Sequence, residues 1–541
     1  MTKRIITLVL ALAMLATACA FAVAEDYKWS GTISVAQYAF GPIEDDQITA
    51  LVEERLREYG YDVKFDIVYL ENSQYETLLN LRLANQEAPD IFRVNGGTMV
   101  DQYYQQGVLK SWTEEFFREN APDVAAFIDA GNPLQTNTNI VDATWAMAKR
   151  DGKMVCLPLI SINQGALLNV IYNTQWLEKL GREVPETLDD FVDLMYAFTN
   201  DDPDGNGEND TYGMYTTMLN IIFGAYGSWT GFMHMDTGFW YNVDGEIVSC
   251  DVMPGNKDAL ALLHQMYVDG VIDPEFVTGE NQGGYWAISH SFVNGRIGVS
   301  HGARMTHYTP ANLYGTGNQP GTVLQEFQAI QGPDAKVTIG PWIEGPDGHV
   351  GGFLRYTNTT HGANAYNAKL SDEKLAAIFQ IMNIFATDKD LCVLAANGIE
   401  GKHFEYLDDE FHTKKTLLDD SVNDWQLGVT RLRGIYGPEY PLNEAWMEEN
   451  YNSATNKWMK EVQASYKNLS VTTGYTNVVF DSLPSESTYM SELLTYRNET
   501  WLKIIQGELD VDYYDTYVEE WMKRGGAILT EEANEWYAAH Y

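Results

Sequence analysis

The chain has 541 residues, more than the roughly 250 to 300 at which a single hydrophobic core stops growing, so at least two lobes are expected. Hydrophobic residues make up 45% of the chain and charged residues 21%, which excludes a wholly disordered protein. The formal net charge is −41, from 76 acidic and 35 basic residues. Such a surface repels phosphate backbones, so nucleic acid is not an expected partner, and it disfavours a polyanionic ligand unless arginines in a cleft override it locally.

The amino terminus has the organisation of an export signal. Lys3 and Arg4 precede an apolar run over residues 5–18, so residues 1–24 are predicted to be a signal peptide. Cleavage after Ala24 follows an A-x-A site, whereas the sequence LATAC ending at Cys19 is a possible lipobox. We favour cleavage after Ala24, because apolar residues follow Cys19 where a lipoprotein has a polar tether. The mature protein is therefore expected to be extracytoplasmic, with lipidation at Cys19 as the alternative.

The first part of the mature chain alternates strands with helices. Apolar periodicity and β-branched runs predict strands at 32–35, 63–69 and 89–94, with helices at 46–59 and 75–84. This alternation predicts an α/β fold with a mostly parallel sheet covered on both faces. Ligands bind outside the carboxyl ends of such strands, which points to the loops after Val35 and Val94.

The later elements suggest how two lobes share the chain. Residues 153–173 are predicted as two extended pieces that cross between the lobes, before helices at 174–180 and 187–198. We expect lobe 1 at 28–155 and 341–388, and lobe 2 at 156–340 and 389–541. The last segment should end in bracing helices at 486–506, 513–524 and 530–541, with Gly525-Gly526 as a stop.

An acidic loop carries the most specific motif. It places side-chain oxygens at positions 1, 3, 5 and 9 and a glycine at position 6, as at the front of an EF-hand calcium loop. The candidate ligands are Asp202, Asp204, Asn206, the carbonyl of Glu208, and Asp210. Position 12 is Gly213, where an EF-hand has a bidentate Glu. A structural Ca²⁺ is therefore predicted, and an Asx-rich turn without metal is the alternative.

No hydrolase motif is present. The chain lacks G-x-S-x-G and H-E-x-x-H strings, and His301 and His307 are six residues apart, which is wrong for one helical face. A glycosidase is defined by two spatially paired carboxylates rather than by a string, so a secreted carbohydrate-active enzyme stays as a rival hypothesis. A protein without catalytic activity is the expectation.

Aromatic residues favour a sugar ligand. They make up 13% of the chain and are dense over residues 223–241, which include Trp229. Sugar rings stack their C–H faces on such side chains, although core packing is the alternative interpretation of any one of them.

Four blocks carry a resemblance to a known family. They are APDIF at 88–92, WLEKLG at 176–181 with VPETLDDF at 184–191, the acidic loop at 202–213, and GIEGKHF at 398–404. With the terminal stretch 504–537, the chain resembles extracellular solute-binding protein family 1, in the subgroup of alginate-oligosaccharide-binding and LipO-like proteins of carbohydrate ABC importers. The resemblance covers nearly all of the mature chain.

The resemblance implies a two-lobed, periplasmic-binding-protein-like type II fold with hinge crossings, closing on a carbohydrate. It implies an ABC permease as partner, with the membrane reached only through the permease or a lipid anchor at Cys19. Calcium is implied in the acidic loop, although Thr211 stands where relatives often add an acidic residue. A sensor that presents ligand to a membrane kinase is the other hypothesis. The ligand-contact positions that the resemblance implies are Tyr38, Asn95, Gln164 and Arg304. We add Trp229 and Trp342 as stacking candidates.

Overall fold

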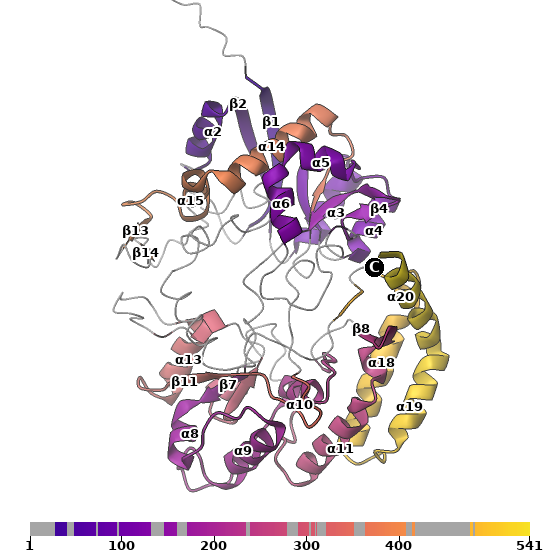
Figure 1. Ribbon diagram of the computed structural model, residues 1–541. Coiled ribbons are helices and arrows are strands. Elements are labelled where there is room, and N and C mark those ends of the chain that lie inside the picture. The colour runs from indigo at the N-terminus through magenta and orange to yellow at the C-terminus, as the bar shows by residue number, and fades with distance from the viewer. Residues whose placement is uncertain are drawn as a thin grey trace, which may run out of the picture.

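The computed structural model describes residues 27–39, 48–71, 74–94, 97–130, 145, 147–158, 170–233, 238–277, 290–301, 305–308, 310, 321–350, 363–406, 414–416, 477–479 and 482–540. These residues form two lobes, one above the other in Figure 1, with the carboxyl-terminal helices along one side. Among them, no helix is both long and apolar enough to cross a membrane.

The upper lobe is built on a five-stranded sheet with the order β2-β1-β3-β12-β6. β1 (Trp29–Ala39) runs parallel to β2 (Tyr61–Glu71) over its full length, and β3 (Ile91–Val94) is parallel on its other side. β12 (Ala363–Tyr366) inserts antiparallel between β3 and β6 (Cys156–Pro158). The predicted parallel arrangement is confirmed for β1, β2 and β3. The antiparallel strand, β12, comes from a distant part of the chain.

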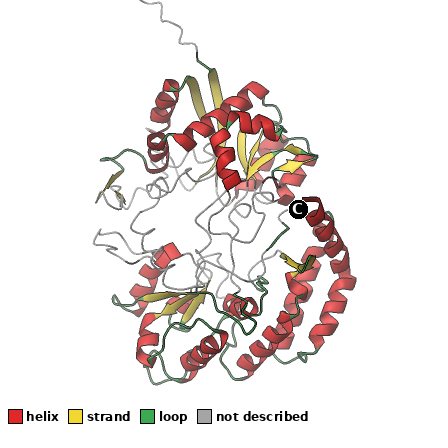
Figure 2. Cartoon of the chain, viewed as in Figure 1, coloured by secondary structure: helices red, strands yellow, loops and turns green. Residues whose placement is uncertain are grey.

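Helices cover both faces of this sheet (Figure 2). Val35 and Ala36 are consecutive in β1 and belong to two separate hydrophobic clusters, because successive strand residues point to opposite faces. The upper-lobe helices are α2 (Ile48–Glu58), α3 (Tyr75–Ala84), α4 (Gly97–Gln105), α5 (Glu114–Asn120), α6 (Pro122–Ala130), α14 (Asp372–Thr387) and α15 (Lys389–Asn397). Two short hairpins complete the elements, β4 (Lys149–Arg150) with β5 (Lys153–Met154) and β13 (Phe404–Tyr406) with β14 (Lys414–Thr416).

The lower lobe has a three-stranded sheet with β7 (Val170–Asn173) in its centre. β10 (Val299–His301) and β11 (Val337–Gly340) pair antiparallel with β7 on either side. The surrounding elements are α8 (Thr174–Leu180), α9 (Leu188–Asn200), η3 (Thr216–Met218), α10 (Leu219–Ala225), η4 (Cys250–Val252), α11 (Gly255–Val268), α12 (His290–Val293), η6 (Met305–Tyr308) and α13 (Thr322–Gln331), with the hairpin β8 (Trp240–Val243) and β9 (Glu246–Ser249). Thr187 caps α9 by accepting a hydrogen bond from the amide of Asp190, three residues later in the chain.

Three helices close the chain and pack on the lower lobe. α18 (Glu486–Ile505) lies against α11, and α19 (Tyr513–Trp521) leads through the wide turn η8 (Met522–Gly526) into α20 (Ala527–His540). Gly525 has φ +123°, a conformation that favours glycine, so the predicted stop is a kink between two helices. The third helix begins at Ala527, three residues earlier than expected.

The two hydrophobic cores place three segments differently from the expected boundaries. β6 belongs to the upper-lobe sheet, although lobe 2 was expected to start at 156. Trp342 and Val350 belong to the lower-lobe core, and α15 packs on α2 in the upper lobe, although the expected changes of lobe were at 341 and 389. Short strands and single helices carry no periodicity that identifies the sheet on which they will pack.

Candidate functional site

A pocket of about 1090 Å³ lies between the upper lobe and the carboxyl-terminal helices. Its upper wall comes from α4, with Asp101, Gln102 and Gln105, and from β4 with Asp151, the residue that follows it. Its lower wall comes from one face of α18, with Trp536 of α20 beside it. Both lobes therefore contribute to one cavity, which the sequence did not reveal because its walls lie more than 300 residues apart.

Ion pairs fix the upper wall of this pocket. The Arg150 guanidinium pairs with Asp101 and donates to the carbonyl oxygen of Met147 at 3.1 Å. The Lys149 ammonium lies 2.7 Å from the carboxylate of Glu114 on α5. Both cations that line the pocket therefore have a carboxylate partner.

The lower wall is fixed by the start of α18. The Ser485 amide and hydroxyl donate to the two carboxylate oxygens of Glu532, at 2.9 and 2.6 Å, and so join α18 to α20. The next carboxylate, Glu486, accepts from the Leu483 amide at 2.9 Å. Burial raises the pKa of Glu486, and the negative charge of Asp101 in the opposite wall raises it further.

Of the four ligand contacts that the resemblance implies, the structure describes only Tyr38. Asn95, Gln164 and Arg304 lie outside the described residues, so their convergence on one cleft stays a prediction. Tyr38 is one residue before the end of β1, where it pairs with Leu70 of β2, rather than in a loop after the strand. The first strand runs four residues past the predicted end at Val35, because β2 offers partners along its whole length.

Trp229 and Trp342 lie together in the lower-lobe core. Their exposed fractions are 4% and 1%, and their rings meet edge to face with centroids 5.9 Å apart. Most of their surface is therefore in contact with protein. Stacking of either ring on a sugar stays a prediction.

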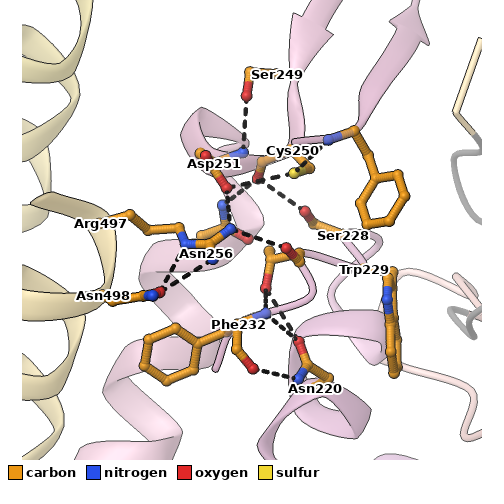
Figure 3. Close-up of polar contacts among 12 residues, drawn as sticks. Asn220, Ser228, Trp229, Phe232, Ser249, Cys250, Asp251, Asn256, Arg497 and Asn498 are labelled. Atoms are coloured by element: carbon orange, nitrogen blue, oxygen red, sulfur yellow. Dashed lines mark hydrogen bonds and ion pairs between the residues drawn. The ribbon is translucent and has the colours of Figure 1, made fainter. Parts of the chain in front are cut away.

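A buried polar network holds the loop that carries Trp229 (Figure 3). The side chain of Asn220 on α10 donates to the carbonyl of Phe232 and accepts from the amide of Phe232, both at 2.9 Å. The Ser228 hydroxyl donates to the carbonyl of Cys250 at 3.1 Å, and the Tyr241 hydroxyl donates to the carbonyl of Trp229. These contacts fix both sides of the loop.

Arg497 of α18 joins this network from the carboxyl-terminal helices. Its guanidinium donates to the carbonyl of Thr230 at 3.0 Å and to the carboxylate of Asp251 at 2.8 Å. Sequence reasoning missed both Arg497 and Asp251. The available signal was one arginine on the apolar face of a predicted helix, which does not identify its partner.

The acidic loop folds as a tight series of side-chain to backbone hydrogen bonds. Asp202 Oδ1 accepts from the amides of Gly205 and Gly207, at 2.9 and 3.3 Å. Both glycines have φ +82°, so each needs the freedom of glycine there. The side-chain oxygen of Asn206 accepts from the Glu208 amide at 2.6 Å.

The amide nitrogen of Asn206 lies between two carboxylates of this loop. It is 2.8 Å from Asp204 Oδ2 and 3.1 and 3.2 Å from the two carboxylate oxygens of Asp210. Partial desolvation raises the pKa of Asp204, and Asp202 and Asp210 raise it further. Among the described residues, no group of three His, Cys, Asp or Glu side chains is arranged to hold a metal ion. The loop shown is a hydrogen-bonded turn with crowded carboxylates.

Residues 41–261 match the family model described as bacterial extracellular solute-binding protein. This segment, which is less than half of the chain, is similar to that family. The chain is 23% identical over 491 residues to the polygalacturonan/rhamnogalacturonan-binding protein YtcQ of Bacillus subtilis (strain 168), covering 88% of this chain and 85% of that protein. The match agrees with an extracytoplasmic protein that binds solutes rather than transforms them.

Solved structures share the fold over nearly the whole chain. A solute-binding protein from Bifidobacterium longum infantis, described as binding HMO and associated with an ABC transporter, has a TM-score of 0.62 at 15% identity and covers 94% of this chain and 98% of that one. The S. pneumoniae ABC-transporter substrate-binding protein FusA in complex with kestose has a TM-score of 0.60 at 17% identity, covering 94% and 99%. These likenesses confirm the predicted two-lobed, periplasmic-binding-protein-like α/β fold.

Proposed function

We propose that this protein is the extracytoplasmic substrate-binding component of an ABC importer, which captures an oligosaccharide between its lobes and delivers it to a membrane permease. The observation that carries the proposal is the pocket whose walls come from the upper lobe and from the helices packed on the lower lobe. The names of similar proteins give further support, because they describe binding of polygalacturonan/rhamnogalacturonan, HMO and kestose.

The geometry suggests how binding leads to delivery. A ligand that contacts both walls has its full set of contacts only when the lobes are close together, so it stabilises the closed arrangement by its differential affinity. A permease that recognises the closed arrangement then receives loaded protein in preference to empty protein. This role needs no bond to be made or broken in the pocket.

Export is part of the same proposal. We propose that residues 1–24, which lie outside the described residues, form the signal peptide. Cleavage after Ala24 then releases the mature protein. Mass spectrometry of the secreted protein distinguishes this from lipidation, because a lipoprotein begins at an acylated Cys19.

We also propose that the acidic loop holds a structural Ca²⁺ through Asp202, Asp204, Asn206, the Glu208 carbonyl and Asp210. Its support is the raised pKa of Asp204 beside two further carboxylates, since a bound cation offsets such repulsion. A structure of FusA described as an EF-hand mutant gives support from a relative with a TM-score of 0.59 at 18% identity. When bound, the ion supplies a hard cation that holds the loop together.

A thermal-shift screen over oligosaccharides tests the function. A ligand at about 100 times its dissociation constant adds roughly 2.7 kcal/mol to the folded state, so a binder raises the melting temperature visibly. Mass spectrometry of the recovered sugar should show it intact. A shortened sugar, absent from a heat-inactivated control, would instead support the secreted enzyme, and the absence of any binder would contradict the proposal.

A further inference from the structure

The pocket between α4 and α18 has more carboxylates than cations in its lining, although the chain is similar to a polygalacturonan/rhamnogalacturonan-binding protein. Its charged lining residues are three carboxylates, Asp101, Asp151 and Glu486, and two cations, Lys149 and Arg150. Each cation is already paired, Arg150 with Asp101 and Lys149 with Glu114. The described lining therefore has no cation without a partner to receive an acidic sugar.

An acidic sugar would be unfavourable in this pocket for a second reason. Asp151, which accepts a hydrogen bond from the Tyr104 hydroxyl at 2.8 Å, contributes one carboxylate to the lining, and Glu486 contributes another from α18. A uronate entering here must either break an existing ion pair or lie among like charges, and both cost free energy. The whole chain, with its net charge of −41, adds to the repulsion.

Neutral hydroxyl groups find suitable partners in the same walls. Gln102 and Gln105 lie on one face of α4, and Ser487 and Ser491 lie on the facing side of α18, each pair spaced for one helical face. All four are exposed, and within the described part of the chain their side chains make no hydrogen bond. They can donate to and accept from sugar hydroxyls without a loss elsewhere in the fold.

Two further features fit an oligosaccharide rather than a single sugar. The volume of about 1090 Å³ is slightly above the roughly 300 to 1,000 Å³ usual for small-molecule sites. Trp536 is partly exposed at the edge of the pocket and offers an aromatic surface to the C–H face of a sugar ring.

We infer that this pocket binds a neutral oligosaccharide, held between Gln102 and Gln105 of α4 and Ser487 and Ser491 of α18, and that it discriminates against uronic-acid sugars. The inference rests on the proposed function and deepens it by naming the class of sugar and the two helices that hold it. A sugar in this position bridges the upper lobe and the carboxyl-terminal helices.

The test measures binding of neutral and acidic tetrasaccharides to the mature protein by calorimetry. The neutral probes are maltotetraose, cellotetraose, xylotetraose and nystose, and the acidic probe is tetragalacturonic acid. At least one neutral probe should bind more tightly than the acidic one. Tight binding of tetragalacturonic acid alone would overturn the inference while leaving the proposed function intact, whereas binding of no probe would overturn both.

Matched variants locate the bound sugar. Gln105→Ala should weaken binding of the neutral probe by about threefold to tenfold, the value of one hydrogen bond, whereas Gln106→Ala, on the next residue and outside the pocket, should leave it unchanged. Ser491→Trp should fill part of the cavity and weaken binding at least tenfold, and Thr488→Trp, exposed on α18 outside the lining, is its control. Equal affinities in Gln105→Ala and Gln106→Ala would show that the sugar binds elsewhere.

Discussion

The Arg497 guanidinium and the Asp251 carboxylate lie 2.8 Å apart with both side chains fully buried, although 246 residues separate them in the sequence. Arg497 is in α18 and Asp251 in η4, so the pair connects the carboxyl-terminal helices to the lower lobe. The same guanidinium donates to the Thr230 carbonyl, one residue after Trp229. The pair therefore links α18, which lines the interlobe pocket, to the loop that carries Trp229.

Asp251→Asn should destabilise the protein by about 3 to 5 kcal/mol, because it leaves a buried guanidinium without its counter-charge. The measurement is the urea midpoint followed by tryptophan fluorescence. Glu492→Gln is the control. Glu492 is also in α18 and forms an exposed ion pair with Arg524 at 3.1 Å, and loss of this pair should cost less than about 1 kcal/mol. Equal midpoints for the two variants would contradict the role of the buried pair.

Gly345 is a second position where the fold allows almost no change. A Cβ at this residue would lie 1.7 Å from the carbonyl oxygen of Ala225, at the end of α10, and a backbone oxygen cannot turn aside. Gly345→Ala should therefore cost at least about 1 to 3 kcal/mol through overpacking.

Gly238→Ala is the matched control for this substitution. There the added Cβ would lie 3.2 Å from the terminal carbon of Met490, a flexible side chain that can shift. The melting temperature of Gly345→Ala should fall well below that of Gly238→Ala. Similar values would mean that the loop at Gly345 moves away from α10 at little cost.

Local chemistry explains which parts of the fold the sequence predicts. Thr187 and Asp190 mark the start of α9 because a cap uses residues three apart, and Gly525 marks the kink before α20 because its φ is positive. β12 is four residues long and pairs with strands from two distant segments. Nothing in its own sequence identifies those partners, so the antiparallel insertion in the sheet could not be predicted.

The same limit applies more strongly to the candidate site. The acidic loop could be found in the sequence because its ligands are contiguous, from Asp202 to Asp210. The interlobe pocket forms where α18 faces α4 of the upper lobe, and the Arg497–Asp251 pair forms where α18 packs on the lower lobe. In the sequence these residues are ordinary amides, hydroxyls and charges, and only the tertiary structure makes them neighbours.

Asp388 should make the upper lobe sensitive to acid. Its carboxylate caps α15 through the Leu391 amide at 3.0 Å and accepts from the Tyr59 hydroxyl at 2.8 Å and the Arg55 guanidinium at 3.0 Å. Burial alone would raise the pKa of Asp388, but these three donors lower it below its ordinary value. The stabilisation is therefore present above the unfolded pKa of about 3.9 and is lost as the pH falls through the lower folded pKa.

Asp388→Asn should remove this acid dependence and lower stability at pH 7 by about 1 to 3 kcal/mol. Thermal melts between pH 7 and pH 2.5 compare it with Asp372→Asn, an exposed carboxylate that pairs with Lys110 at 2.7 Å and whose loss should cost less than about 1 kcal/mol. If wild type and Asp388→Asn lose stability in parallel on acidification, other carboxylates dominate the acid response.

Calcium should stabilise the native state through the acidic loop. Asp202, Asp204 and Asp210 place three carboxylates within nine residues. Partial desolvation raises the pKa of Asp204, and the neighbouring Asp202 and Asp210 raise it further. The unfolded chain does not hold these oxygens together, so Ca²⁺ should bind the folded protein preferentially and raise its stability by mass action. Removal of Ca²⁺ with EDTA should then lower the melting temperature by a few degrees, which corresponds to about 1 to 3 kcal/mol.

The decisive comparison is between two aspartates near each other in the chain. Asp204→Ala should melt at the temperature of EDTA-treated wild type and should respond to neither Ca²⁺ nor EDTA, because it removes a ligand. Asp193→Ala, which deletes an exposed carboxylate of α9 outside the loop, should respond to both as wild type does. Metal analysis of the purified protein should find about one calcium per chain in wild type and Asp193→Ala only. If wild type carries no calcium and melts at one temperature under all conditions, the Asn206 amide between Asp204 and Asp210 is a sufficient substitute for a cation, and the loop is an Asx-rich turn.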